Sequence, residues 1–242
     1  TALHAAAEEF REVVDACSDE NVARAKLGWW AEEMQRACKG QPRHPVTQVL
    51  AESLRKMGAD AGRFAAVLEA LNKHLSRDSY RSLAALESHY ERLADITGCL
   101  AAELCGYQDP RTLAAARALG SGLLLAELAR RPQRPSARRV TDLPDETLAA
   151  CGATRAELGA KHTSPALKKA IATVAERART RLRESLEQMP ALDHVAQRSR
   201  RILAEIELAQ LLAVQRADFA VLERPRGVTP LHKLWIAWKH RL

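Results

Sequence analysis

The stretch that decides the fold is residues 110–130, which read PRTLAAARALGSGLLLAELAR. Ala and Leu, both strong helix formers, dominate it, and the triplet Leu123-Leu124-Leu125 makes it unusually apolar. The stretch therefore predicts a helix with a central place in a helical bundle. Gly106 to Pro110 break the pattern before it, and the prolines of 131–144 forbid a continuous helix after it.

Helical signals extend outward from this stretch over the whole chain. Hydrophobic spacing and capping residues predict helices at 2–16, 20–38, 46–57, 60–76, 79–105, 110–130, 145–150, 154–159, 164–188, 191–221 and 229–241. Of the 242 residues 47% are hydrophobic and only 4% are aromatic, with 11 Gly and 10 Pro. This composition predicts an all-α fold, in one domain over 1–242, and excludes collagen-like, disordered and disulfide-scaffold classes. No run approaches eighteen uncharged apolar residues, so no transmembrane segment is expected.

The net charge of +7 favours contact with an anionic partner: nucleic acid, an anionic membrane surface or a phosphorylated ligand. General use of Arg in the source proteome explains the excess equally well. The five cysteines form no CxxC pair and lie in apolar helical stretches, so buried free thiols in a reducing compartment are expected. The first residue is Thr1 and not Met, which leaves a targeting segment open.

Three features could carry chemistry, and each has a plainer interpretation. Carboxylates at Glu8, Glu12 and Asp15 share a helix face and could hold a divalent cation, or form a solvated acidic face. The pairs Trp29-Trp30 and Trp235/Trp238 could stack on bases, but core or interface positions are favoured. The basic stretch 130–139 could grip a diphosphate, or be a solvated loop.

Several strings taken together resemble the squalene/phytoene synthase superfamily. Residues 24–30 (RAKLGWW), followed by two glutamates, resemble the stretch after the first metal motif of that family. His44-Pro45-Val46 matches the opening of the family's next helix, and 119–144 has the length of its Leu-Gly to Tyr-Leu-Pro segment. Residues 227–235 (GVTPLHKLW) resemble its C-terminal stretch. The resemblance covers nearly the whole chain.

The resemblance implies an isoprenoid-synthase-like helical bundle around a central cavity. Active members condense two prenyl diphosphates head to head, with Mg²⁺ held by two aspartate-rich motifs on facing helices. Metal ions are needed there because departure of the diphosphate concentrates negative charge.

Both metal motifs are degenerate in this chain. Where the family has Asp-Asp-x-x-Asp, the sequence has Arg11-Glu12-Val13-Val14-Asp15, which leaves Glu12 and Asp15 as a reduced metal-binding set. The second motif's Gln, Asn and Asp-x-x-x-Asp positions carry Leu124, Glu127, and the segment from Arg131 to Pro135. A further acidic patch of the family falls on the degraded residues 69–74.

Replacement of a metal-binding Asp by Arg reverses the local charge by two units, and such a site repels Mg²⁺. Arg138 and Arg139 match the family's basic pair and, with Arg134, are candidate diphosphate ligands. Around 119–144 the chain resembles a non-catalytic branch of the superfamily, the mitochondrial complex I assembly factor, more than it resembles active synthases.

Three functions follow as hypotheses. The first is a non-catalytic family member, a pseudoenzyme that binds a lipid or diphosphate or acts in assembly. Its expected partners are a prenyl diphosphate or lipid, a protein, and a membrane surface touched peripherally. No cofactor is expected for it, and its location is cytoplasmic or peripheral on the inner membrane face.

The second hypothesis is an active prenyl-diphosphate-condensing transferase with altered metal use, in which Mg²⁺ and the carboxylates of Glu12, Asp15 and Glu127 remain and arginines replace a metal. The third is a basic helical nucleic-acid-binding protein. Nucleic acid is not expected as a partner, because the arginines are dispersed and no recognition module is visible.

Overall fold

The computed structural model describes residues 2–17, 19–75, 79–133, 141–223 and 227–239. The α-helices are α1 (Ala2–Ala16), α2 (Glu20–Cys38), α3 (Pro45–Lys56), α4 (Ala61–Leu75), α5 (Leu83–Ala94), α6 (Ala101–Cys105), α7 (Arg111–Arg130), α8 (Asp145–Cys151), α9 (Pro165–Glu187), α10 (Arg198–Arg216) and α11 (Pro230–Lys239). A π-helical turn, η1 (Asp95–Leu100), and two 3₁₀ turns, η2 (Arg155–Gly159) and η3 (Ala191–Asp193), complete them. No residue in the described ranges lies in a strand, which confirms the predicted all-α class.

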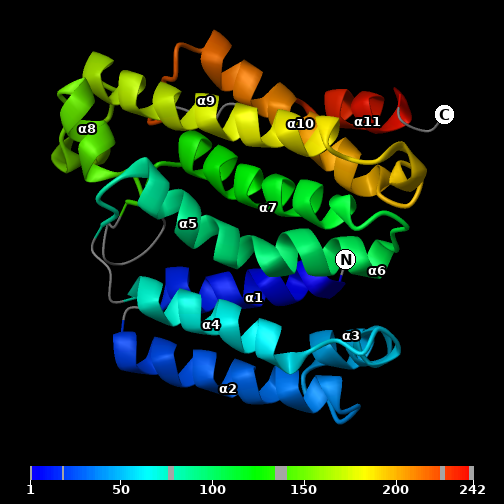
Figure 1. Cartoon of the computed structure of the whole chain (residues 1–242). Helices are drawn as coiled ribbons and strands as arrows, with labels where there is room; N and C mark the ends of the chain where they lie inside the picture. Colours follow the sequence, from blue (N-terminus) through cyan, green and yellow to red (C-terminus); the bar gives the residue numbers. More distant parts are fainter. Residues whose placement is uncertain (1, 18, 76–78, 134–140, 224–226, 240–242) are drawn as a thin grey trace.

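Helix α7 is the central helix that its sequence predicts (Figure 1). It packs against α9, α5, η1 and α10. Glycines permit the closest approaches, because a Cβ added at Gly98 of η1 would lie 2.5 Å from the Ala116 carbonyl oxygen. Within the described part of the chain, only α7 is long and apolar enough to cross a bilayer, and 67% of its apolar window is buried in the fold.

Helix α1 joins the two sides of the molecule. In Figure 1 it lies between the layer of α2, α3 and α4 and the layer that contains α5, α6 and α7. It contacts α2, α3 and α4 on one side and η1 on the other. Phe10 of α1 meets Trp30 of α2 edge to face, with ring centres 5.0 Å apart. Because one face of α1 is held by these contacts, the orientation of its polar face is also set.

The buried carboxylate of Glu33 orders the turn between α2 and α3. It accepts hydrogen bonds from the backbone N–H groups of Arg43 (2.7 Å) and His44 (2.9 Å), from the Thr47 hydroxyl, and from Arg36. Burial alone would raise the pKa of Glu33, but these hydrogen bonds lower it to about 2. The string His44-Pro45-Val46 thus forms the capped start of α3, with Pro45 at its first position.

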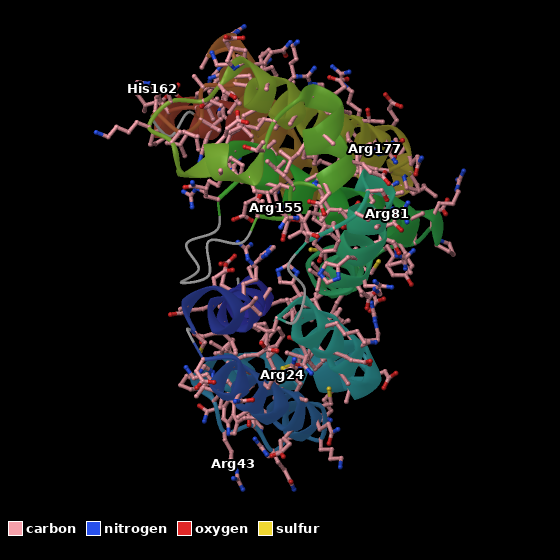
Figure 2. All side chains as sticks on the ribbon, turned by 90° about the vertical axis from the view of Figure 1, so that its left-hand side faces the viewer. Arg24, Arg43, Arg81, Arg155, His162 and Arg177 are labelled. Carbon is pink, nitrogen blue, oxygen red and sulfur yellow. The ribbon has the colours of Figure 1, made fainter. Side chains whose placement is uncertain are left out.

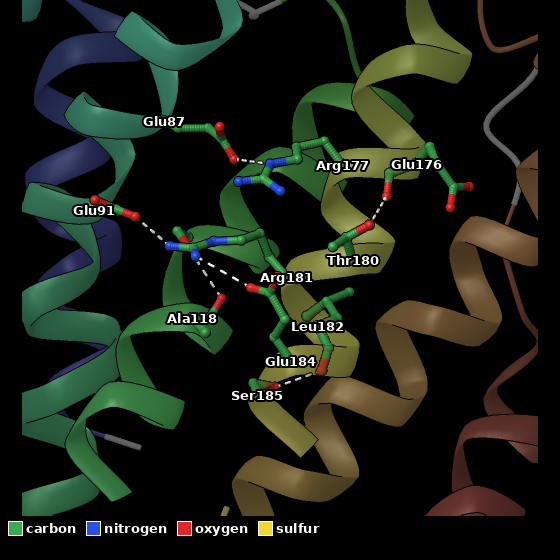
Figure 3. Close-up of polar contacts among 11 residues, drawn as sticks. Glu87, Glu91, Ala118, Glu176, Arg177, Thr180, Arg181, Leu182, Glu184 and Ser185 are labelled. Carbon is green, nitrogen blue, oxygen red and sulfur yellow. Dashed lines mark hydrogen bonds and ion pairs between the residues drawn. The ribbon is translucent and has the colours of Figure 1, made fainter. Parts of the chain in front are cut away.

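Arginines on α9 tie it to α5 across α7 (Figure 3). Arg177 pairs with Glu87, and Arg181 pairs with Glu91. The Arg181 Nε also donates to the Ser121 hydroxyl of α7 at 3.2 Å. Two arginines of α9 are therefore paired with carboxylates of the fold itself. The labelled arginines are spread along the molecule, from Arg43 at one end to Arg177 toward the other (Figure 2).

Two predicted helices are wrong in their extent. The stretch 79–105 is divided into α5, η1 and α6, and 191–221 contains η3 followed by the shorter α10. Asp193 explains the second break, because its carboxylate accepts the backbone N–H groups of Gln108 (2.7 Å) and Asp109 (3.1 Å). α10 ends before Asp218 and Phe219, which have positive φ angles of 51° and 54°.

The five cysteines are free, as predicted, but most are not buried. Cys99 is buried among helices, whereas Cys105 is exposed, and Cys17, Cys38 and Cys151 are half-buried. The prediction of buried thiols is therefore wrong for all but Cys99. Burial raises the pKa of the Cys99 thiol, which makes it less reactive.

Candidate functional site

Helices α1 and α7 bring residues of both predicted motif segments to one cavity of about 140 Å³. Helical spacing explains the convergence: Arg11 and Asp15 are four residues apart on α1, and Leu124, Glu127 and Arg131 follow one face of α7 to its end. The cavity is lined by Arg11, Val14, Asp15, Leu71, Tyr90, Leu93, Leu124, Glu127, Leu128, Arg131, Gln133 and Asp142.

An ion pair links α1 and α7 at this cavity. The Arg11 Nη2 lies 2.6 Å from the Glu127 Oε1, and each side chain is 33% exposed. Burial alone would lower the pKa of the Arg11 guanidinium, but the charges of Glu127, Glu8 and Asp15 raise it above its ordinary value. Arg11 is therefore a fixed cation that occupies the space between α1 and α7.

Of the two carboxylates predicted to bind metal, Asp15 lines the cavity. Glu12 is exposed and is not among the lining residues, so the structure does not bring Glu12 and Asp15 together at this cavity. Its position on α1 explains this, because Glu12 lies between Arg11 and Asp15 in the sequence but on another side of the helix.

The donors at the cavity do not fit a Mg²⁺ cluster. Glu127 is engaged by Arg11, and Arg131 adds a second cation to the lining. Among the residues that the structure describes, no group of three or more His, Cys, Asp or Glu side chains is placed to hold a metal ion. Mg²⁺ prefers several oxygen ligands and is repelled by neighbouring cations.

Arg130 and Arg131 diverge at the end of α7. Arg130 turns to α10, where its Nη2 lies 3.2 Å from the Glu207 carboxylate, while Arg131 faces the cavity. Burial raises the pKa of Glu207. The remaining predicted residues of the basic loop, Arg134, Pro135, Arg138 and Arg139, lie outside the described residues.

A buried polar network that includes two residues of the cavity lining was not predicted. The Tyr90 hydroxyl donates to the Asp142 Oδ2 at 2.8 Å, and the Asp142 Oδ1 lies 3.6 Å from the His74 Nε2. His74 in turn meets the Tyr80 hydroxyl at 2.8 Å. The only sequence signal was His74 at the end of the degraded patch 69–74, since Asp142 lies 52 residues from Tyr90.

The cavity is small for a prenyl chain. A void of roughly 150 Å³ accepts a molecule of about the size of benzene. Farnesyl diphosphate carries fifteen carbons in its chain, so the described walls of this cavity leave room for only part of one such chain.

Similarity to solved structures supports the all-α fold. A dehydrosqualene synthase in complex with ligand superposes with a TM-score of 0.83 at 18% identity, covering 99% of this chain and 85% of that one. Squalene synthase HpnC from Alicyclobacillus acidocaldarius gives 0.75 at 20% identity, covering 90% and 82%. YisP from Bacillus subtilis gives 0.68 at 14% identity, covering 98% and 96%.

Sequence comparison adds a relative and a family. The chain is 22% identical over 250 residues to mouse (Mus musculus) NADH dehydrogenase (ubiquinone) complex I, assembly factor 6, a match that covers all of this chain and 74% of that protein. The profile described as squalene/phytoene synthase matches residues 1–234. Because this match covers almost the whole chain, the chain belongs to the squalene/phytoene synthase family.

Proposed function

We propose that this chain is a family member that does not condense prenyl diphosphates and that acts as an assembly-type protein. The observation that carries the proposal is the Arg11–Glu127 ion pair, which links the two helices whose aspartates hold Mg²⁺ in active members. Arg11 supplies the charge that a metal would supply, but as a permanent part of the fold, and it engages a carboxylate that Mg²⁺ would need.

The charge balance of the cavity lining supports this proposal. Its acidic members are Asp15, Glu127 and Asp142, and Glu127 and Asp142 accept contacts from Arg11 and Tyr90. Ionisation of an allylic diphosphate requires strong neutralisation of the leaving group. Two arginines that are themselves balanced by these acids supply much less of it than a metal cluster does.

The small cavity favours an assembly-type role over storage of a prenyl lipid between α1 and α7. The mouse relative is named as a complex I assembly factor, and the match to it covers the whole of this chain. A role in the assembly of a respiratory NADH dehydrogenase is therefore the function to test first.

The test is rescue in source cells that lack the chain. We expect deletion to lower the amount of assembled NADH dehydrogenase on native gels, and the Asp15→Asn variant to restore it as well as the wild type does. Asp15→Asn removes the carboxylate that α1 contributes to the cavity while keeping its size. Failure of this variant at normal protein level, or normal assembly after deletion, would contradict the proposal.

The second candidate is a transferase with altered metal use. Asp15 and Arg131 face the same cavity, and a guanidinium can bind a diphosphate through two hydrogen bonds, which favours this candidate. It predicts condensation products from farnesyl or geranylgeranyl diphosphate and loss of these products in Asp15→Asn. Product formation that is unchanged in that variant would remove its basis.

A further inference from the structure

Helix α11 carries an apolar stripe that faces away from the fold. Leu231, Leu234, Trp235 and Trp238 follow one another at helical spacing, with exposed fractions of 79%, 66%, 50% and 64%. Ile236, on the opposite side of the helix, is buried against the bundle. Four large apolar side chains on ten residues of surface helix exceed the scattered exposure that is normal for a soluble face.

Only cationic or neutral side chains accompany this stripe. The titratable residues of Pro230–Lys239 are His232, Lys233 and Lys239, and none is acidic. The Lys239 Nζ lies 4.1 Å from the Trp235 ring centre, so one cation adjoins the stripe directly. A helix with Trp and Leu on one face and cations beside it is typical of segments that lie in a membrane interface.

The charge continues onto α9 and α10. A groove of about 820 Å³ runs between α9, α10 and α11 and adjoins the stripe at Trp235. Arg179, Arg183 and Lys239 line it, and Glu205 is its one acidic lining residue. The Arg179 guanidinium is already bound by Glu176 and Gln215, which leaves Arg183 and Lys239 as the cations that face outward.

From this arrangement we infer that α11 is a docking surface for an anionic phospholipid bilayer. The stripe lies in the apolar boundary of the bilayer, the two tryptophans lie at headgroup level, and Arg183 and Lys239 contact lipid phosphates. This inference does not depend on the proposed function. A second copy of the chain fits less well, because self-pairing of the stripes would bring the lysines of one copy against those of the other.

The experiment measures binding of the full chain to vesicles of phosphatidylcholine with 30% phosphatidylglycerol, by co-sedimentation and by the blue shift of tryptophan fluorescence. We expect the Trp235→Ser/Trp238→Ser variant to bind at least about tenfold more weakly. The matched control is Trp29→Ser, because Trp29 is 42% exposed on α2, in the layer remote from α11 (Figure 1). It should bind as the wild type does.

Charge is tested with Lys239→Glu against Lys26→Glu, an exposed lysine on α2. We expect the first to weaken binding several-fold and the second to leave it unchanged, and binding to weaken as salt rises. Leu231→Ser, at an exposed position that packing does not constrain, repeats the stripe test should the double variant fold poorly.

Three results would overturn the inference. The first is equal binding by wild type and the stripe variants. The second is equal binding to vesicles of phosphatidylcholine alone. The third is a dimer in solution that the stripe variants dissolve while the wild type binds no vesicles, which would assign the face to a second copy.

Discussion

Reversal of the charge at Arg11 tests whether an arginine has taken the place of metal between α1 and α7. Arg11→Asp would put a third carboxylate beside Asp15 and Glu127, which restores the kind of site that Mg²⁺ binds. We expect the variant to be less stable than the wild type and to regain stability when Mg²⁺ is added. The wild type should not respond to Mg²⁺.

The expected loss of stability follows from how exposed the Arg11–Glu127 ion pair is. Loss of one partner costs about 0–1 kcal/mol for an exposed pair and about 3–5 kcal/mol for a buried one, and the side chains of Arg11 and Glu127 are each 33% exposed. Arg11→Ala should therefore lower the free energy of unfolding by about 1–2 kcal/mol, which is about 2–8 °C in Tm for a chain of this size. Arg11→Asp adds repulsion and should cost about 2–4 kcal/mol.

The assay is thermal unfolding followed by circular dichroism, with and without 10 mM Mg²⁺. A site with a Kd of about 1 mM would return about 1.4 kcal/mol at that concentration. The control is Lys56→Asp, because Lys56 pairs with Glu52 within α3, neither residue lines the cavity, and both side chains are more exposed (67% and 70%). A Tm of Arg11→Asp that equals that of the wild type, or that Mg²⁺ does not raise, would show that Arg11 does not occupy a former metal position.

Three further predictions concern the fold around the site. Glu33→Gln should remove a stabilisation of about 3 kcal/mol, because the pKa of Glu33 in the folded protein is about 2, below its ordinary value. The wild type keeps this contribution above about pH 5 and loses it as the pH falls toward 2. The urea midpoints of the two proteins should therefore converge in acid. Gly98→Ala should lower the stability measured in a thermal melt by about 1–3 kcal/mol, because the added Cβ would meet a backbone carbonyl. Gly28→Ala, with open space around the added Cβ, should raise the stability by about 0.5–1 kcal/mol. The reverse order of stabilities would contradict this packing. Tyr90→Phe should lower the free energy of unfolding in denaturant by about 1–2 kcal/mol, because the buried Asp142 carboxylate loses a hydrogen-bond donor. An unchanged denaturant midpoint would show that water replaces the hydroxyl.

Sequence alone predicted the helices whose stability is local. The run 110–130 became the buried α7 because its apolar residues suit a helix that is covered on several sides. The prediction of helix ends failed where contacts between residues far apart in the sequence determine them. The break before α10 depends on Asp193, which binds the start of the α7 region more than eighty residues away. Nothing in its immediate neighbours indicates that contact.

At the candidate site too, the sequence predicted which residues take part but not the contacts between residues far apart in the chain. Arg11, Asp15, Glu127 and Arg131 were found through their positions in family motifs, yet only the folded chain shows that Arg11 pairs with Glu127 across 116 residues. Glu12 was chosen by type and spacing, but the buried face of α1 turns it to solvent. The network around Asp142 was missed because its members are ordinary residues until burial removes water from them.

The central claim is that this family member does not ionise a prenyl diphosphate. The most direct measurement is a single-turnover incubation of protein in excess over farnesyl diphosphate with Mg²⁺, analysed by mass spectrometry for released pyrophosphate and for C30 products. We expect intact farnesyl diphosphate and no product above a protein-free control. Protein-dependent formation of squalene or presqualene diphosphate, abolished by Asp15→Asn, would contradict it.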